Sequence, residues 1–210
     1  LVAIFQNHHK EAVVEYLCTS ILDIDPNNKF ALRTLADYYR TSGNDKIWDI
    51  YEQIIKLDFE EADIVKALAE HYEAIGNAEK STEYCKKAIL RYVNAGNVSA
   101  TKEMWTKLVQ LIPQEIDFFQ LVKRKATKTL GNDKTAGLLE ELYTWYKDNE
   151  NWDTAIALLK EILTLDPKDN WARREITECF KKKHGAHSHL EDYVKSSNLT
   201  QNFRNVFEAI

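Results

Sequence analysis

The stretch from residue 62 to residue 92 predicts two amphipathic helices joined by a tight turn. In its first half, apolar side chains recur every three or four residues and form one helical stripe, made of Val65, Leu68, Ala69, Tyr72 and Ile75. Gly76-Asn77 interrupts this pattern, and either residue can take the left-handed conformation that ends a helix. A second stripe follows, and it consists of Ala78, Ser81, Tyr84, Cys85, Ala88, Ile89 and Tyr92. Two short helices joined in this way lie antiparallel and form a hairpin.

Similar stripes recur along the chain at a nearly constant interval. Leu35 lies 33 residues before Leu68, and Leu142 opens a comparable stripe 74 residues after it, which leaves room for one divergent pair between them. We expect further helices over 7–24, 29–41, 45–57, 97–111, 114–130 and 170–183, and a pair on either side of 149–151. The apolar side of the first one is predicted to carry Ala12, Val13, Tyr16, Leu17, Ser20, Ile21 and Ile24. Trp48 is expected to pack on the next hairpin.

The spacing of Leu68, Ala69, Tyr72, Gly76 and Ala88 resembles the tetratricopeptide repeat, a helical hairpin of about 34 residues. The resemblance implies an all-α fold, a right-handed superhelical solenoid of about five hairpins over residues 1–184. The third hairpin, over 97–130, is degenerate, and short C-terminal helices are expected over 185–210.

The composition agrees with exposed helix faces and excludes some partners. Charged residues make up 29% of the chain, against only three Pro and six Gly. The net charge of −5 argues against the broad positive field that non-specific nucleic-acid binding needs. Three well-separated cysteines within apolar stripes suit buried thiols in a reducing compartment, and no apolar run is long enough for a membrane span. We therefore expect a cytoplasmic protein that does not cross a membrane. The helical pattern continues to both ends of the sequence, Leu1 and Ile210, so we expect it to be part of a longer protein.

A tetratricopeptide array binds its ligand in a groove lined by the first helix of each hairpin. The resemblance places ten residues there: Phe30, Arg33, Asp37, Arg40, Lys66, Glu70, Glu73, Glu140, Thr144 and Lys147. The subclass that clamps a terminal carboxylate uses Lys and Asn, but here Asp37 follows Arg33 and Glu70 follows Lys66. An acid repels such a ligand, so we expect a protein or peptide ligand of another kind, or simply a solvated face.

The tail carries a second resemblance. Asn198-Leu199 followed by Phe203-Arg204-Asn205-Val206 is similar to the region after the helical repeats of long bacterial Gre-type transcript cleavage factors. The resemblance implies a repeat extension of a transcription elongation factor that acts with RNA polymerase. Gre-type factors hold a catalytic magnesium at an acidic coiled-coil tip, whereas Glu60-Glu61 opens a short helix, where acids favour the N-terminus. We expect the catalytic hairpin to lie outside this chain.

The sequence contains no GxSxG, Walker loop or HExxH motif. It therefore favours a non-catalytic scaffold for protein–protein interaction, and we expect no catalytic, cofactor or metal site. Two alternatives remain open. The basic runs at Lys123-Arg124-Lys125 and Lys181-Lys182-Lys183 suit a nucleic-acid-binding array, although cations also favour helix C-termini. A loose cluster of possible zinc ligands comprises His184, His187, His189 and Glu191.

Overall fold

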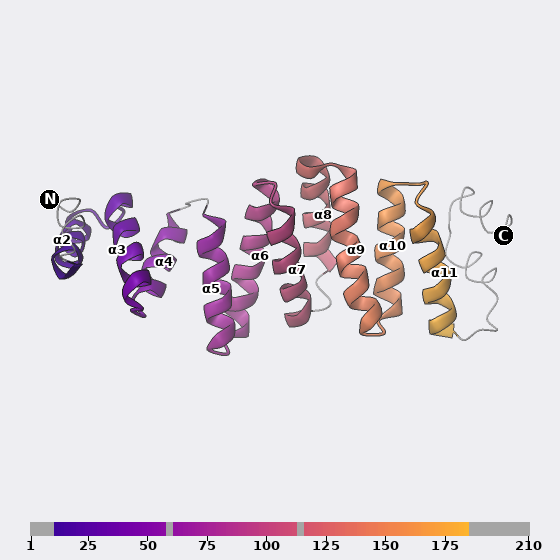
Figure 1. The fold of residues 1–210 in the computed structure, drawn as a ribbon, viewed down its shortest axis with the longest axis horizontal. Coiled ribbons are helices and arrows are strands. Elements are labelled where there is room, and N and C mark those ends of the chain that lie inside the picture. The colour runs from indigo at the N-terminus through magenta and orange to yellow at the C-terminus, as the bar shows by residue number, and fades with distance from the viewer. Residues whose placement is uncertain (1–10, 58–60, 113–115, 185–210) are drawn as a thin grey trace. The chain divides into compact units, whose positions relative to one another are not determined.

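The computed structural model describes residues 11–57, 61–112 and 116–184, and within these ranges the chain is helical without strands (Figure 1). The helices are α2 (Glu11–Ile24), α3 (Lys29–Ser42), α4 (Ile47–Lys56), α5 (Ala62–Ala74), α6 (Ala78–Asn94), α7 (Val98–Leu111), α8 (Ile116–Leu130), α9 (Asn132–Asp148), α10 (Trp152–Leu165) and α11 (Asn170–His184). The all-α prediction is confirmed for the described residues. The short helices expected over 185–210 lie outside them, as does the first part of the helix expected over 7–24.

Four of the connections between helices use the same local geometry. In each, a residue with positive φ is followed by an Asn whose backbone N–H donates to the carbonyl of a Tyr five residues earlier. The pairs of Asn and Tyr are Asn44 with Tyr39, Asn77 with Tyr72, Asn97 with Tyr92, and Asn151 with Tyr146. At Gly76 the φ is 75°, a conformation that costs glycine little, so this residue ends α5 as predicted. Asn77 then caps α6 by accepting a hydrogen bond from the Lys80 amide.

The hairpin of α5 and α6 is held together by small residues of the two predicted stripes. Ala69, Ser81 and Ala88 are fully buried, and the Ser81 hydroxyl donates to the Ala69 carbonyl at 3.0 Å. A side chain that reaches the backbone of the facing helix requires the two helices to approach closely. Leu68 and Ile89 fill the space around this contact and are also fully buried.

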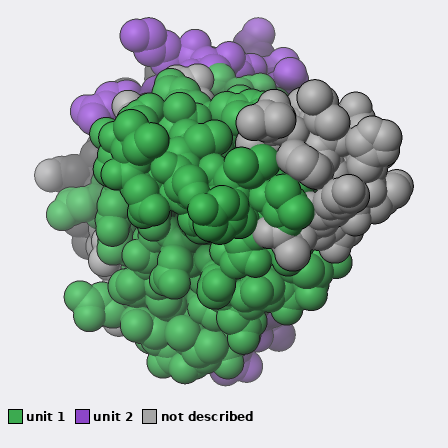
Figure 2. All heavy atoms as spheres, turned by 90° about the vertical axis from the view of Figure 1, so that its left-hand side faces the viewer, with its two compact units in different colours: residues 1–118 green, residues 119–210 purple. Residues whose placement is uncertain are grey.

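Extensive helix–helix contacts join helices that are consecutive in the chain, and the chain divides into two compact units, coloured in Figure 2. Unit 1 spans Leu1–Phe118 and unit 2 spans Phe119–Ile210, so the boundary falls in the first turn of α8. Within unit 1 the contacts run from α2 through α7, and within unit 2 from α9 through α11. The predicted boundary between 184 and 185 coincides with the end of the described residues and stays a prediction.

A polar triad joins neighbouring helices in unit 1. The Tyr72 hydroxyl of α5 donates to the Glu52 carboxylate of α4, and Lys80 of α6 binds the same carboxylate at 2.8 Å. Hydrogen bonds from Lys80 and then from Tyr72 lower the pKa of Glu52. The Tyr72 ring also stacks on Tyr84, with centroids 5.6 Å apart. Trp48 stacks on His71 of α5 at 4.0 Å, which confirms that it packs on the following hairpin.

The predicted apolar stripes are wrong at four residues and right at the thiols. Tyr16 and Ile24 of α2 are 70% and 88% exposed, whereas Val14 and Cys18 of this helix are buried. Ala78, the first residue of α6, is also exposed. Ile75 is 60% exposed because α5 ends at Ala74, so the helical phase no longer aims its side chain at α6. The three cysteines are buried and form no disulfide. Burial raises the pKa of Cys85 to about 11.

Candidate ligand-binding pocket

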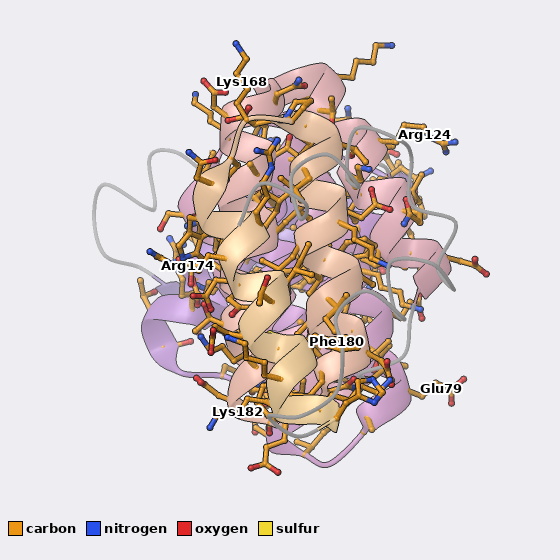
Figure 3. The ribbon with its side chains drawn as sticks, turned by 90° about the vertical axis from the view of Figure 1, so that its right-hand side faces the viewer. Glu79, Arg124, Lys168, Arg174, Phe180 and Lys182 are labelled. Atoms are coloured by element: carbon orange, nitrogen blue, oxygen red, sulfur yellow. The ribbon has the colours of Figure 1, made fainter. Side chains whose placement is uncertain are left out.

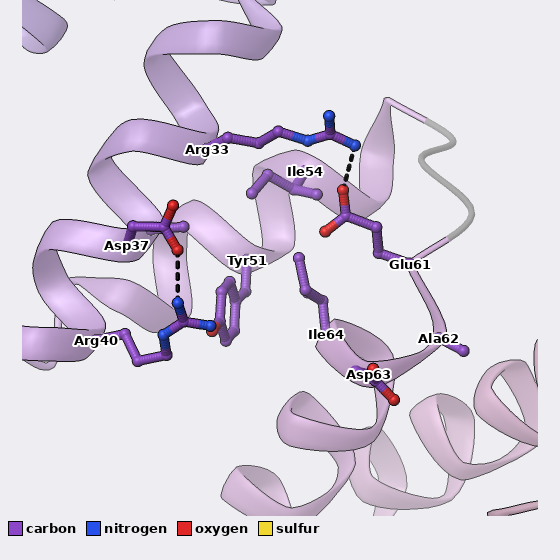
Figure 4. A pocket seen from close by; sticks show the side chains of 10 residues that line it. Arg33, Asp37, Arg40, Tyr51, Ile54, Glu61, Ala62, Asp63 and Ile64 are labelled. Carbon is purple, nitrogen blue, oxygen red and sulfur yellow. Dashed lines mark hydrogen bonds and ion pairs between the residues drawn. The ribbon is translucent and has the colours of Figure 1, made fainter. Parts of the chain in front are cut away.

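Unit 1 contains a pocket with a volume of about 600 Å³, built by α3, α4 and the start of α5 (Figure 4). One face of α3 supplies Arg33, Ala36, Asp37 and Arg40, which follow the three- and four-residue spacing of a single helix face. Tyr51 and Ile54 of α4 form a buried floor. The opposite wall is the segment that enters α5, residues 61–64. The volume lies in the range of small-ligand pockets and suits one or two side chains of a partner.

Two ion pairs hold the rim of the pocket. Arg33 of α3 pairs with Glu61, which occupies the N-cap position of α5 without capping the helix through its side chain. Arg40 pairs with Asp37 one turn earlier, with 2.7 Å between Nη2 and Oδ1. Both arginine side chains are more than half exposed, so these pairs contribute little stability. They do neutralise both cations of the pocket.

Asp63 is the acid of the pocket that no cation matches. Among the described residues, its carboxylate accepts a hydrogen bond from the Tyr92 hydroxyl at 2.7 Å and has no ion pair. Tyr92 is buried, and burial followed by the hydrogen bond to Asp63 raises the pKa of its phenol, which therefore stays neutral. A neutral donor orients the carboxylate but leaves its charge uncompensated. The lining thus holds two Arg against three acids, a formal charge of −1.

Of the ten predicted groove residues, the structure brings three into this pocket, namely Arg33, Asp37 and Arg40. Phe30 precedes them on α3 and is 54% exposed, but it does not line the pocket. The three on α5 lie in a separate charge network with α7. There Lys66 binds Glu103 at 2.6 Å, and Lys107 binds Glu73 at 2.6 Å and approaches Glu70 at 3.9 Å.

The remaining three groove residues lie on α9 in unit 2. Glu140 and Thr144 are exposed, and the Thr144 hydroxyl donates to the Glu140 carbonyl of its own helix. Lys147 binds Glu175 of α11 at 2.7 Å, and Tyr143 donates to the same carboxylate. Burial alone raises the pKa of Glu175, but the hydrogen bonds from Lys147 and Tyr143 outweigh it and lower the pKa. This cluster stabilises the contact between α9 and α11.

The sequence pattern missed the pocket residues outside α3. Ile54 is fully buried, and the sequence places Glu61 at a helix N-terminus, which the structure confirms. Nothing in their spacing indicates that they face Arg33, because Arg33 and Glu61 are separated by 28 residues and a whole helix. The sequence signal that could have indicated this wall of the pocket is the start of α5, where two acids, Glu61 and Asp63, flank Ala62.

Three of the six cations in the two basic runs form ion pairs, and the two runs lie apart. Lys123 of α8 binds Glu161 and Thr164, and its side chain is 18% exposed. Lys181 pairs with Glu178, and Lys183 with Asp153. Figure 3 shows Arg124 and Lys182 at opposite ends of unit 2. The described residues therefore do not form the continuous basic face that nucleic-acid binding favours.

The described residues contain no group of three side chains placed to hold a metal ion. Of the predicted histidine cluster, His184 is exposed and its ring lies 4.6 Å from that of Phe180, while the other three residues lie outside the described ranges. Among the helices that the structure describes, none has the length and apolar character needed to cross a bilayer.

Comparison with known proteins relates the whole chain to proteins named for GreA. It is 47% identical over 210 residues to a GreA-associated domains protein of Treponema pallidum, covering 100% of this chain. It is 35% identical over 211 residues to a transcription elongation factor GreA of Borreliella burgdorferi, covering 99% of this chain. No family model matches. The prediction of a helical region related to Gre-type proteins is confirmed.

The chain spans 32% and 23% of the lengths of these two relatives. Most of each relative therefore lies outside the region that matches. The tail segment that carried the Gre-type resemblance lies outside the described residues. The relation therefore rests on the sequence identity over the 210 residues of this chain and not on the structure of residues 185–210.

Proposed function

We propose that this chain is a non-catalytic protein-binding region of a longer Gre-related transcription elongation factor that acts with RNA polymerase in the cytoplasm. Its helices form a tetratricopeptide-like solenoid, and the pocket of α3, α4 and α5 holds part of the protein ligand. The observation that carries the proposal is that the whole chain matches only a part of two longer proteins named for GreA. In this proposal the chain is one module of a longer protein, and a Gre-type catalytic hairpin lies elsewhere in that protein.

The structure supports a binding role through the character of the pocket. An open pocket with a buried apolar floor and charged rim offers both desolvation and orientation to a side chain of a partner. Successive helical hairpins also present extended surfaces, which is how repeat proteins bind other proteins.

The proposal is tested with the intact protein that carries this chain and with purified RNA polymerase from the same organism. Biolayer interferometry measures the affinity of the wild type and of Asp63→Lys, which reverses the charge of the pocket acid that has no cation partner among the described residues. We expect the substitution to weaken binding by about tenfold, equivalent to about 1.4 kcal/mol. Glu79→Lys is the matched control, because this exposed acid of α6 undergoes the same charge change outside the pocket (Figure 3).

An intact protein that shows no binding to polymerase, alone or in a transcribing complex, would refute the polymerase role. Equal weakening by Asp63→Lys and Glu79→Lys would point instead to a general charge effect. Circular dichroism of both variants establishes that the helices are retained.

A further inference from the structure

We propose that the pocket of α3, α4 and α5 takes the basic side chain, lysine or arginine, of an extended protein segment. The aliphatic stem of that side chain lies against Ala62 and Ile64, and its charged end binds Asp63 at the rim. The inference rests on the proposed function as a protein-binding module and adds the chemistry of the ligand.

The first argument is the charge that the pocket leaves uncompensated. Arg33 and Arg40 are neutralised by Glu61 and Asp37. Asp63 has only the hydroxyl of Tyr92 as a partner among the described residues. A ligand carboxylate would have to break one of the rim ion pairs and approach Asp63, whereas a ligand cation completes the pairing without breaking either.

The second argument is the shape and chemistry of the walls. Ala62 and Ile64 are apolar and half-buried, so they offer the ligand an accessible apolar surface, while Ala36 and Ile54 are buried behind the pocket (Figure 4). Lysine and arginine combine a methylene stem with a terminal charge, and such side chains bury the stem along apolar surface while the charge stays at the edge. A small hydrated cation would use none of these walls. The acids of the pocket also fail to form a metal-binding group.

The third argument is the charge of the unit that carries the pocket. Residues 1–118 contain 13 Lys and Arg against 19 Asp and Glu, a formal net charge of −6. Residues 119–210 contain 15 against 14, a formal net charge of +1. The negative potential is therefore concentrated in unit 1, where it attracts a basic segment and increases its rate of association.

The experiment uses the 210-residue chain and blocked pentapeptides, acetyl-Gly-Ala-Xaa-Ala-Gly-amide, with Lys, Arg, Leu or Glu at the variable position. Titrations followed by ¹H–¹⁵N NMR report affinity and location together. We expect the Lys and Arg peptides to bind with a dissociation constant on the order of 1 mM, and to shift the amides of residues 61–64. The Leu and Glu peptides should bind at least about fivefold more weakly.

Asp63→Asn should weaken binding of the Lys peptide by about threefold to fivefold, the upper range for an exposed ion pair. Glu79→Gln is the matched control, since Glu79 is an exposed acid in the first turn of α6 and points away from the helices in Figure 3. Tighter binding of the Glu or Leu peptide, shifts confined to other residues, or equal effects of the two substitutions would overturn the inference. These outcomes leave the polymerase test unaffected, because that test measures the intact protein.

Discussion

Tyr72→Phe removes one hydroxyl group from the junction of α4, α5 and α6. That hydroxyl donates to Glu52 and accepts from Lys80 at 2.8 Å, while the ring stacks on Tyr84. The substitution keeps the ring and its stacking. It therefore isolates the contribution of the hydrogen bonds that connect α5 with the preceding helix.

The expected loss in free energy of unfolding is about 1 kcal/mol. Hydrogen bonds to charged groups contribute about 1.5 to 3 kcal/mol, but Tyr72 is only half-buried, and Lys80 still binds Glu52 after the change. Tyr72→Ala also loses the stacking and the buried ring, so its cost should approach about 3 kcal/mol, the lower end for aromatic truncation in a core.

Urea unfolding at pH 7, followed by far-ultraviolet circular dichroism, measures both changes. Tyr16→Phe is the control, since Tyr16 is 70% exposed and its hydroxyl makes no hydrogen bond within the described residues. Tyr72→Phe within about 0.3 kcal/mol of this control would refute the role of the hydroxyl. The difference should also shrink in acid, because Glu52, with its lowered pKa, becomes protonated only as the pH falls below its ordinary value of 4.5.

Three further predictions concern glycine, acid and the first basic run. Gly137→Ala lies in the middle of α9 with open space for the new Cβ, so it should raise the free energy of unfolding by up to about 1 kcal/mol. Gly76→Ala, at a φ of 75°, should lower the free energy of unfolding by about 1 kcal/mol in the same urea assay. Stability should be constant above about pH 5 and fall below pH 4.5, because four carboxyl groups have lowered pKa values in the folded chain; a urea midpoint unchanged to pH 3 would contradict this. These groups are Glu15, Glu52, Glu161 and Glu175. Lys123→Met should lower the free energy of unfolding by about 1 kcal/mol, because the ion pair with Glu161 is lost. Binding of single-stranded DNA at low salt, measured by fluorescence anisotropy, should stay at background in the wild type and in this variant. Binding that falls with this substitution would favour the nucleic-acid alternative.

Local sequence signals predicted the helices because the forces that end a helix act over a few residues. The amide of Asn77 bonds to the carbonyl of Tyr72 across five residues, and the Asn77 side chain caps α6 three residues on. The same signal recurs at Gly96-Asn97. It also recurs with Glu150 in the left-handed position, which a search for glycine alone misses.

Burial at the ends of helices could not be predicted in the same way. Ile24 continues the period of α2, yet it is 88% exposed because no described helix covers the end of α2. Periodicity says which side chains share a face of a helix. It does not say how far the neighbouring helix extends along that face.

By itself, the sequence determined an all-helical chain, the positions of its turns and the small residues that let α5 and α6 approach. Only the tertiary structure decided that Arg33 and Arg40 are neutralised by nearby acids, that Asp63 is left without a cation, and that Lys123 is engaged with Glu161. Helix signals depend on short-range hydrogen bonds and periodic burial, which are written in neighbouring residues. The charge balance of a pocket depends on side chains that come from three helices, and their distances are defined only after these helices have packed.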